Sequence, residues 1–157
     1  AQFCAAANEA GVDGVIIPDL PPEEADTLLS IAPEYNLATI FLVAPTSPPE
    51  RLRAIASVST GFIYCVSVTG VTGARNSLSD EIPPMISQLH EYTDKPVCVG
   101  FGVSTRQQAH EVSQIADGVI VGSAIINVIE KHLGDEGAIV SGVEEFAKDL
   151  AAGVKEK

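Results

Sequence analysis

The sequence predicts an α/β fold in which short parallel strands alternate with helices along the whole chain. Runs of apolar, largely β-branched residues recur at strand length, and a longer stretch with helical periodicity follows each run. Each run is nearly continuous in apolar residues, a pattern typical of parallel strands that are covered on both faces. The two observations together favour repeated strand–helix units over an all-helical or antiparallel fold.

The expected strands are set by the apolar runs at 12–18, 37–44, 61–68, 97–101 and 118–121. The expected helices lie at 22–33, 48–57, 80–92, 105–115, 124–132 and 136–155. Before the first strand, the chain has the pattern of the second half of a helix that Gly11 ends. Pro22 and the two acids after it suit a first helical turn. Ser104 is the expected N-cap of the helix at 105–115.

Five strand–helix units fit either an open doubly wound sheet or a (β/α)8 TIM barrel. A barrel typically takes about 250 residues, and the chain has 157. An open five-stranded sheet would leave two unpaired edges, which invite pairing with another chain. We therefore expect residues 1–157 to form a single domain, the carboxyl-terminal part of a TIM barrel, with the amino-terminal strands preceding Ala1.

Composition narrows the classes of function. The formal net charge is −12, from 9 Lys and Arg against 21 Asp and Glu. This balance argues against binding to nucleic acid or to an anionic membrane surface, because both need clustered cations. No apolar stretch has the length of a bilayer-spanning helix. Three scattered cysteines are too few for a disulfide framework, so we expect a cytoplasmic protein.

Two glycine turns predict a phosphate site. Gly102 and Gly122 each lie between a predicted strand and a predicted helix, where free N–H groups and the helix dipole favour an anion. Glycine has no Cβ, so a phosphate can approach its backbone closely, and Ser123 adds a hydroxyl donor. A phosphate held between the loops after the last two strands is a recurring feature of barrels. The alternative is that both glycines serve only as tight turns.

Other candidates are less specific. The long polar loop at 69–79 suits a lid over a ligand, or a plain solvated connection. Tyr64 interrupts an aliphatic strand; its hydroxyl reaches a ligand if its face lines the barrel lumen, and otherwise its ring packs against a helix. Asp19 is the one carboxylate at a strand end and also fits a turn. The histidines fall on predicted helices, and no His, Cys or acid spacing indicates a metal site.

Four segments carry a family resemblance in this order: PDLPPEE at 18–24, GFIYCVSVTGVTGAR at 61–75, VGFGVS at 99–104 and VGSAII at 121–126. Together they resemble the alpha chain of tryptophan synthase over the whole length. The resemblance implies a TIM-barrel lyase of tryptophan biosynthesis that cleaves indole-3-glycerol phosphate to indole and glyceraldehyde 3-phosphate. It implies no cofactor in this chain, and a beta-chain partner that carries pyridoxal phosphate in an α2β2 heterotetramer.

The resemblance also assigns residues. It implies phosphate contacts by Gly73, Gly102, Gly122 and Ser123. Tyr64 matches the active-site tyrosine and Thr72 the threonine of the lid, and these are the expected catalytic positions. Phe101 matches an aromatic residue beside the indole ring, and Pro21 lies in a loop that resembles part of the face meeting the beta chain.

One departure from the family is large. The family's catalytic glutamate and its partner aspartate are expected before Ala1. The cleavage needs a group that protonates indole C3 and a group that removes the glycerol hydroxyl proton, so we expect negligible turnover from this chain alone. Two alternatives remain open: another sugar-phosphate barrel enzyme, an isomerase or epimerase, and a non-catalytic half-barrel that only pairs.

Overall fold

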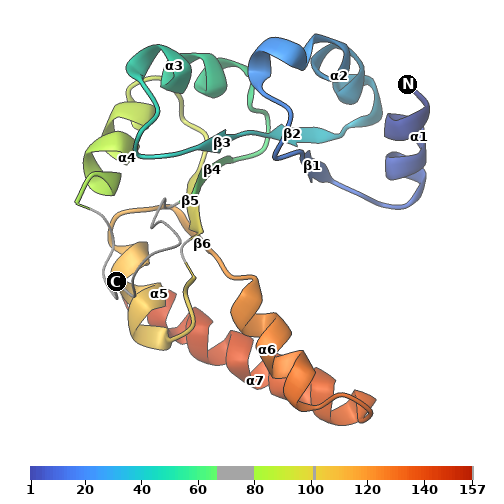
Figure 1. The fold of residues 1–157 in the computed structure, drawn as a ribbon, viewed down its shortest axis with the longest axis vertical. Helices are drawn as coiled ribbons and strands as arrows, with labels where there is room; N and C mark the ends of the chain where they lie inside the picture. The colour runs from blue at the N-terminus through green and yellow to red at the C-terminus, as the bar shows by residue number, and fades with distance from the viewer. Residues whose placement is uncertain (67–79, 101, 157) are drawn as a thin grey trace.

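Parallel strands and the helices between them run in the predicted alternation through a computed structural model that describes residues 1–66, 80–100 and 102–156 (Figure 1). The strands are β1 (Gly14–Ile16), β2 (Ala38–Ile40), β3 (Leu42–Val43), β4 (Ile63–Val66), β5 (Val97–Gly100) and β6 (Gly118–Ile120). The α-helices are α1 (Gln2–Glu9), α2 (Asp26–Ile31), α3 (Pro49–Val58), α4 (Ile82–His90), α5 (Arg106–Ser113), α6 (Ser123–Lys131) and α7 (Glu136–Lys155). Two 3-10 turns, η1 (Pro22–Glu24) and η2 (Ala32–Tyr35), flank α2.

The expected strand at 37–44 is interrupted at Phe41, so its prediction as one strand is wrong. Its first half, β2, pairs with β1. Its second half, β3, belongs to a second sheet, in which the strand order is β3-β4-β5-β6. The backbone nevertheless stays bonded across the interruption, because the Phe41 carbonyl accepts from the amide of Tyr64 at 3.0 Å. The break therefore marks the point where this strand exchanges one neighbour for the other.

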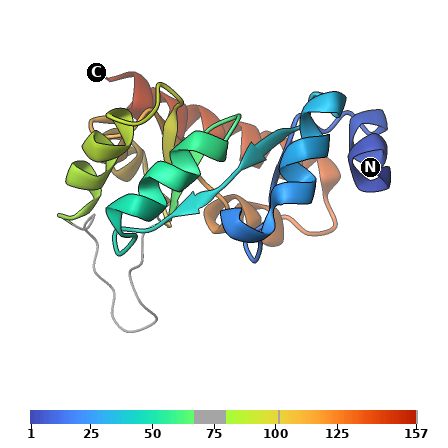
Figure 2. The same cartoon turned by 90° about the horizontal axis from the view of Figure 1, so that it is seen from above.

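Helices cover one face of the sheet. Figure 2 shows α2, α3 and α4 in a row along it. Ile63 of β4 and Val97 of β5 point to this face and have no exposed surface, and they share a core with the apolar sides of α3 and α4. The opposite face is open among the described residues, with Ile16 42% exposed. The expectation that the strands are covered on both faces is therefore wrong for this part of the chain.

The predicted helix at 22–33 is divided into η1, α2 and η2. Pro33 has no N–H to donate, so α-helical hydrogen bonding stops before it, and Asn36 ends the segment with a left-handed φ of 52°. By contrast, the predicted helix at 136–155 coincides with α7. Gly11, with a φ of 76°, follows the end of α1 as expected.

The last two helices form a hairpin that leaves the sheet. α6 and α7 run side by side away from the strands, and α7 also packs against α5 (Figure 1). Gly153 lies buried where α7 meets α5. None of the described helices is both long enough and apolar enough to cross a membrane.

Candidate functional site

The two glycine turns lie side by side at the carboxyl ends of β5 and β6. These strands pair in parallel, and Gly100 is opposite Ile120 in their register. Gly102 and Gly122 follow this pair at the same distance along the chain, so both turns leave the same edge of the sheet. Apart from the adjacent residues of the chain, no described residue has an atom within 4 Å of a Cβ built on either glycine, so the space beside both turns is open to a ligand. Position 102 also favours glycine, because its φ of +53° lies in the left-handed region that other residues rarely adopt.

The helices that follow the two turns differ at their first residues. At α5, the Thr105 hydroxyl accepts from the amide of Gln108 at 3.2 Å, so Thr105 is the N-cap and the assignment to Ser104 is wrong. Ser104 instead donates its own amide to the Gln108 side chain at 2.9 Å. The two bonds resemble a capping box, except that the Gln108 side chain reaches the residue before the N-cap. At α6, the N-cap is Gly122, and no described side chain caps the helix.

The uncapped start of α6 is therefore the stronger of the two candidates for an anion site. The first amides of a helix have no partner within it and carry the positive end of its dipole. Gly122 and Ser123 are both exposed here. These two bonds use two backbone donors at the start of α5, the amides of Ser104 and Gln108, so Gly102 offers a ligand open space rather than a full set of free amides.

Tyr64 faces the lumen side of the sheet. Its neighbours in β4, Ile63 and Cys65, are fully buried on the helix side, so alternation places Tyr64 on the opposite face. A Cβ built on Gly100 would lie 2.5 Å from the Tyr64 hydroxyl oxygen and 2.4 Å from Cε2 of its ring. The tyrosine ring therefore lies across β5, and glycine at position 100 makes room for it.

Sequence reasoning missed the side chains that share this lumen face. The strand registers place Ile40, Leu42 and Cys98 on the same side as Tyr64. Cys98 occupies the space left by Gly118, since a Cβ there would lie 2.7 Å from its sulfur. Burial, together with the nearby carboxylate of Asp117, raises the pKa of the Cys98 thiol. The alternation within each strand would have revealed this set once the face of one member was known.

The loop after β1 holds the two remaining described candidates. Asp19 and Pro21 line a small cavity of about 210 Å³ together with Phe41 and Arg51. Arg51 also pairs with Glu23 at 3.4 Å across exposed surface. Asp19 itself is exposed and lies before η1, which suits a turn.

Several predicted positions lie outside the described residues: Thr72, Gly73, Phe101 and the whole loop at 69–79. The histidines, expected on helix surfaces, contact their neighbours: His90 pairs with Asp117 at 3.3 Å, while His110 and His132 bond to backbone carbonyls. Within the described part of the chain, no group of three His, Cys, Asp or Glu is arranged to hold a metal ion.

Comparisons with known proteins agree on one family. A family model described as tryptophan synthase alpha chain matches residues 1–155. The tryptophan synthase alpha chain of Methanocaldococcus jannaschii is 49% identical over 138 residues, which make up 88% of this chain and 49% of that relative. The chain spans about half the length of the curated relatives it matches.

Solved structures show the same relationship. A structure of tryptophan synthase from Mycobacterium tuberculosis matches with a TM-score of 0.85 at 42% identity, over 99% of this chain and 56% of that one. The tryptophan synthase α2β2 complex from Pyrococcus furiosus matches with a TM-score of 0.77 at 36% identity, over 94% of this chain and 58% of that one. The parallel sheet is thus part of a TIM barrel, and the chain belongs to the tryptophan synthase alpha chain family.

Proposed function

We propose that this chain supplies the phosphate-binding and ring-binding part of a barrel that cleaves indole-3-glycerol phosphate to indole and glyceraldehyde 3-phosphate. Residues 1–157 form one domain in this proposal, the carboxyl-terminal part of the barrel. The observation that carries it is the open pair of turns at Gly102 and Gly122, beside the uncapped start of α6. These turns suit the dianionic phosphate, with Ser123 adding a hydroxyl donor.

The lumen face suits the indole ring. Ile40, Leu42 and Val66 line the side of the sheet on which Tyr64 lies, so the surface offers apolar contact and one hydroxyl. A sugar-phosphate isomerase or epimerase would need several polar groups for the hydroxyls of its substrate. The apolar surface therefore favours the lyase over that alternative.

Each remaining residue has a role in this proposal. Gly73 joins the phosphate site, Thr72 belongs to a lid that closes over substrate, and Phe101 lies beside the indole ring. The Tyr64 hydroxyl donates a hydrogen bond to the bound substrate. A glutamate and an aspartate from the part of the barrel that the match does not cover perform the proton transfers, so the chain alone turns over negligibly.

The proposal extends to a partner and a compartment. The chain binds a tryptophan synthase beta chain, as in the α2β2 complex of its Pyrococcus furiosus relative, and its Pro21 loop forms part of that contact. Pyridoxal phosphate belongs to the beta chain and not to this one. Three free cysteines and a net charge of −12 suit a cytoplasmic protein that binds neither membrane nor nucleic acid.

Isothermal titration of the chain with glycerol 3-phosphate tests the phosphate site. We expect binding by the unmodified chain and at least a tenfold loss in the Gly122→Ala variant, whose added Cβ occupies the approach to α6. Gly137→Ala, at the exposed start of α7, is the matched control and keeps the affinity. Absent binding, or equal affinity in the two variants, would contradict the proposal.

A further inference from the structure

One cation lies close to the glycine turns in the sequence. Arg106 is the only Lys or Arg within four residues of Gly102 or Gly122. An arginine beside a phosphate site usually binds the phosphate itself, because its planar guanidinium matches the phosphate oxygens. In the structure, however, the Arg106 guanidinium pairs with Glu156, and with Asp149 at 3.9 Å. Both described ion pairs of Arg106 therefore lie at the carboxyl-terminal end of α7.

The first turn of α5 also packs directly on the end of α7. Gly153 of α7 lies against the backbone of Arg106, where a Cβ on the glycine would be 2.3 Å from the Arg106 carbonyl oxygen. One turn further along α5, His110 Nδ1 donates a hydrogen bond to the Gly153 carbonyl oxygen at 3.2 Å. The carboxyl-terminal end of a helix also favours a nearby cation. Ion pairs, close packing and a hydrogen bond thus join the two helix ends.

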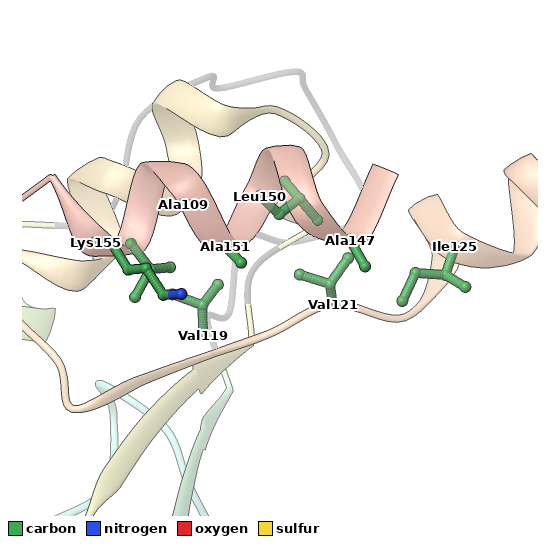
Figure 3. Close-up of a pocket in the computed structure, with 9 residues that line it drawn as sticks. Ala109, Val119, Val121, Ile125, Ala147, Leu150, Ala151 and Lys155 are labelled. Atoms are coloured by element: carbon green, nitrogen blue, oxygen red, sulfur yellow. The ribbon is translucent and has the colours of Figure 1, made fainter. Parts of the chain in front are cut away.

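The contact between α7 and β6 is less close. Figure 3 shows Val119 and Val121 pointing from the β6 segment toward one side of α7, the side that carries Ala147 and Ala151. These side chains line a cavity of about 430 Å³, so they do not fill the space between the helix and the strand. The junction with α5 therefore holds α7 more closely than this contact does.

The junction bears on the phosphate site through a short stretch of chain. Only three residues separate Gly102 from Arg106. The first of them, Val103, is buried in the same apolar cluster as Leu150 of α7. The second, Ser104, donates its amide to a side chain of α5 at 2.9 Å. A displacement of the first turn of α5 would therefore also move the backbone at Gly102.

We propose that Arg106 is a positioning residue for the phosphate site. Its ion pairs with Asp149 and Glu156 fix the first turn of α5 on α7, and thereby hold the Gly102 turn beside the start of α6. The inference rests on the proposed function, because it gives Arg106 a part in the same phosphate site. In this role Arg106 acts through the backbone and does not contact the phosphate. The two carboxylates then favour the binding of an anion, although their own charge opposes it.

Removal of the two carboxylate charges tests this role. If Arg106 were a phosphate ligand, the combined change Asp149→Asn and Glu156→Gln would release its guanidinium and remove two negative charges, so glycerol 3-phosphate would bind more tightly. The positioning role predicts the opposite sign. We expect the dissociation constant in isothermal titration to rise about three- to tenfold, because ion pairs between half-exposed side chains are individually weak.

Two further variants keep the test specific. Arg106→Gln should weaken binding by a similar factor, and Arg106→Lys, which keeps the charge, should recover part of the affinity. The matched control combines Glu144→Gln and Glu145→Gln, which remove the same charge from exposed positions of α7 that form no described ion pair with α5. It should not weaken binding. Tighter or unchanged binding after loss of Asp149 and Glu156, or equal weakening in the control, overturns the positioning role.

Amide deuterium exchange without ligand shows whether the helix start has moved. We expect faster exchange at the start of α5 in the variant that lacks the Asp149 and Glu156 carboxylates, and unchanged exchange in α3. Unchanged exchange at the start of α5 also overturns the positioning role. Retained affinity in this variant contradicts only that role, whereas a lack of glycerol 3-phosphate binding by the unmodified chain contradicts the proposed function and this inference together.

Discussion

The contact between α5 and α7 yields a quantitative prediction about Gly153. A Cβ built on this residue would lie 2.3 Å from the carbonyl oxygen of Arg106 and 3.1 Å from its carbonyl carbon. Both atoms belong to the backbone, so no change of side-chain rotamer relieves the overlap. At the same junction, His110 Nδ1 donates a hydrogen bond to the carbonyl oxygen of Gly153, and Arg106 forms ion pairs with Asp149 of α7 and with Glu156 just after it. Gly153→Ala must therefore move the two helices apart.

The size of the effect follows from this geometry. Carbon and oxygen atoms approach to about 3.3 Å at closest, so the helices must separate by roughly 1 Å. Overpacking of this kind costs about 1–3 kcal/mol, and a rigid backbone neighbour argues for about 3. Alanine in a helix recovers about 1 kcal/mol relative to glycine. We expect a net loss of about 2 kcal/mol, which lowers the melting temperature by roughly 4–8 °C in a chain of this size.

Thermal unfolding followed by circular dichroism measures this change. Gly137→Ala is the control in the same helix, because the nearest atom to its Cβ is a carboxylate oxygen at an ordinary 3.6 Å. It gains about 1 kcal/mol of helix propensity without a clash, so its melting temperature rises by about 2–4 °C. The reasoning is refuted if Gly153→Ala melts at or above the temperature of the unmodified chain, or if the two variants shift in the same direction.

Three further predictions concern single side chains. Gly100→Ala turns the Tyr64 ring away from β5, so the tyrosine band of near-ultraviolet circular dichroism loses the Tyr64 contribution, while the contributions of Tyr35 and Tyr92 and the far-ultraviolet spectrum are kept; an unchanged tyrosine band contradicts the placement. Thr105→Ala removes the cap of α5 and lowers the free energy of unfolding by about 1 kcal/mol in urea titration, whereas Ser104→Ala changes it less. Burial raises the pKa of the Cys65 thiol from 9.0 to about 12, so the unfolded chain releases this proton first as pH rises. The contribution of Cys65 to the free energy of unfolding therefore falls by about 1.4 kcal/mol per pH unit in that window, and Cys65→Ala removes this slope.

The sequence predicted the order of elements well because strand and helix periodicities are local properties. α7 coincides with its predicted range, since Asp135 provides a side-chain cap that accepts from Ala138 and the apolar spacing continues to its end. The interruption at Phe41 could not be predicted in this way. The interruption depends on which strands lie on either side of residues 38–43, and the sequence of these residues does not show which strands they pair with.

The same distinction between local and long-range information applies to the candidate site. The glycine turns follow from residue type and position, because glycine at a strand end has few other uses. The face on which Tyr64 lies could not be predicted, because alternation along a strand separates two faces but does not show which of them lines the lumen. Ser104 and Thr105 are both good caps by chemistry, and only the backbone geometry at the start of α5 selects Thr105. The contact between Gly100 and Tyr64 joins two strands that are far apart in sequence, so no local sequence pattern could predict it.

Because α5 and α6 begin differently, binding of an anion at the glycine turns is expected to order the start of α6 and not that of α5. Thr105 stabilises α5 permanently, whereas α6 begins at Gly122 without an equivalent partner among the described residues. An anion arriving there would complete the first turn of α6 in place of a side chain. We therefore expect amide deuterium exchange in α6 to slow when glycerol 3-phosphate is added, and exchange in α5 to remain unchanged. The exchange rate in the hairpin of α6 and α7 would then report whether the phosphate site is occupied.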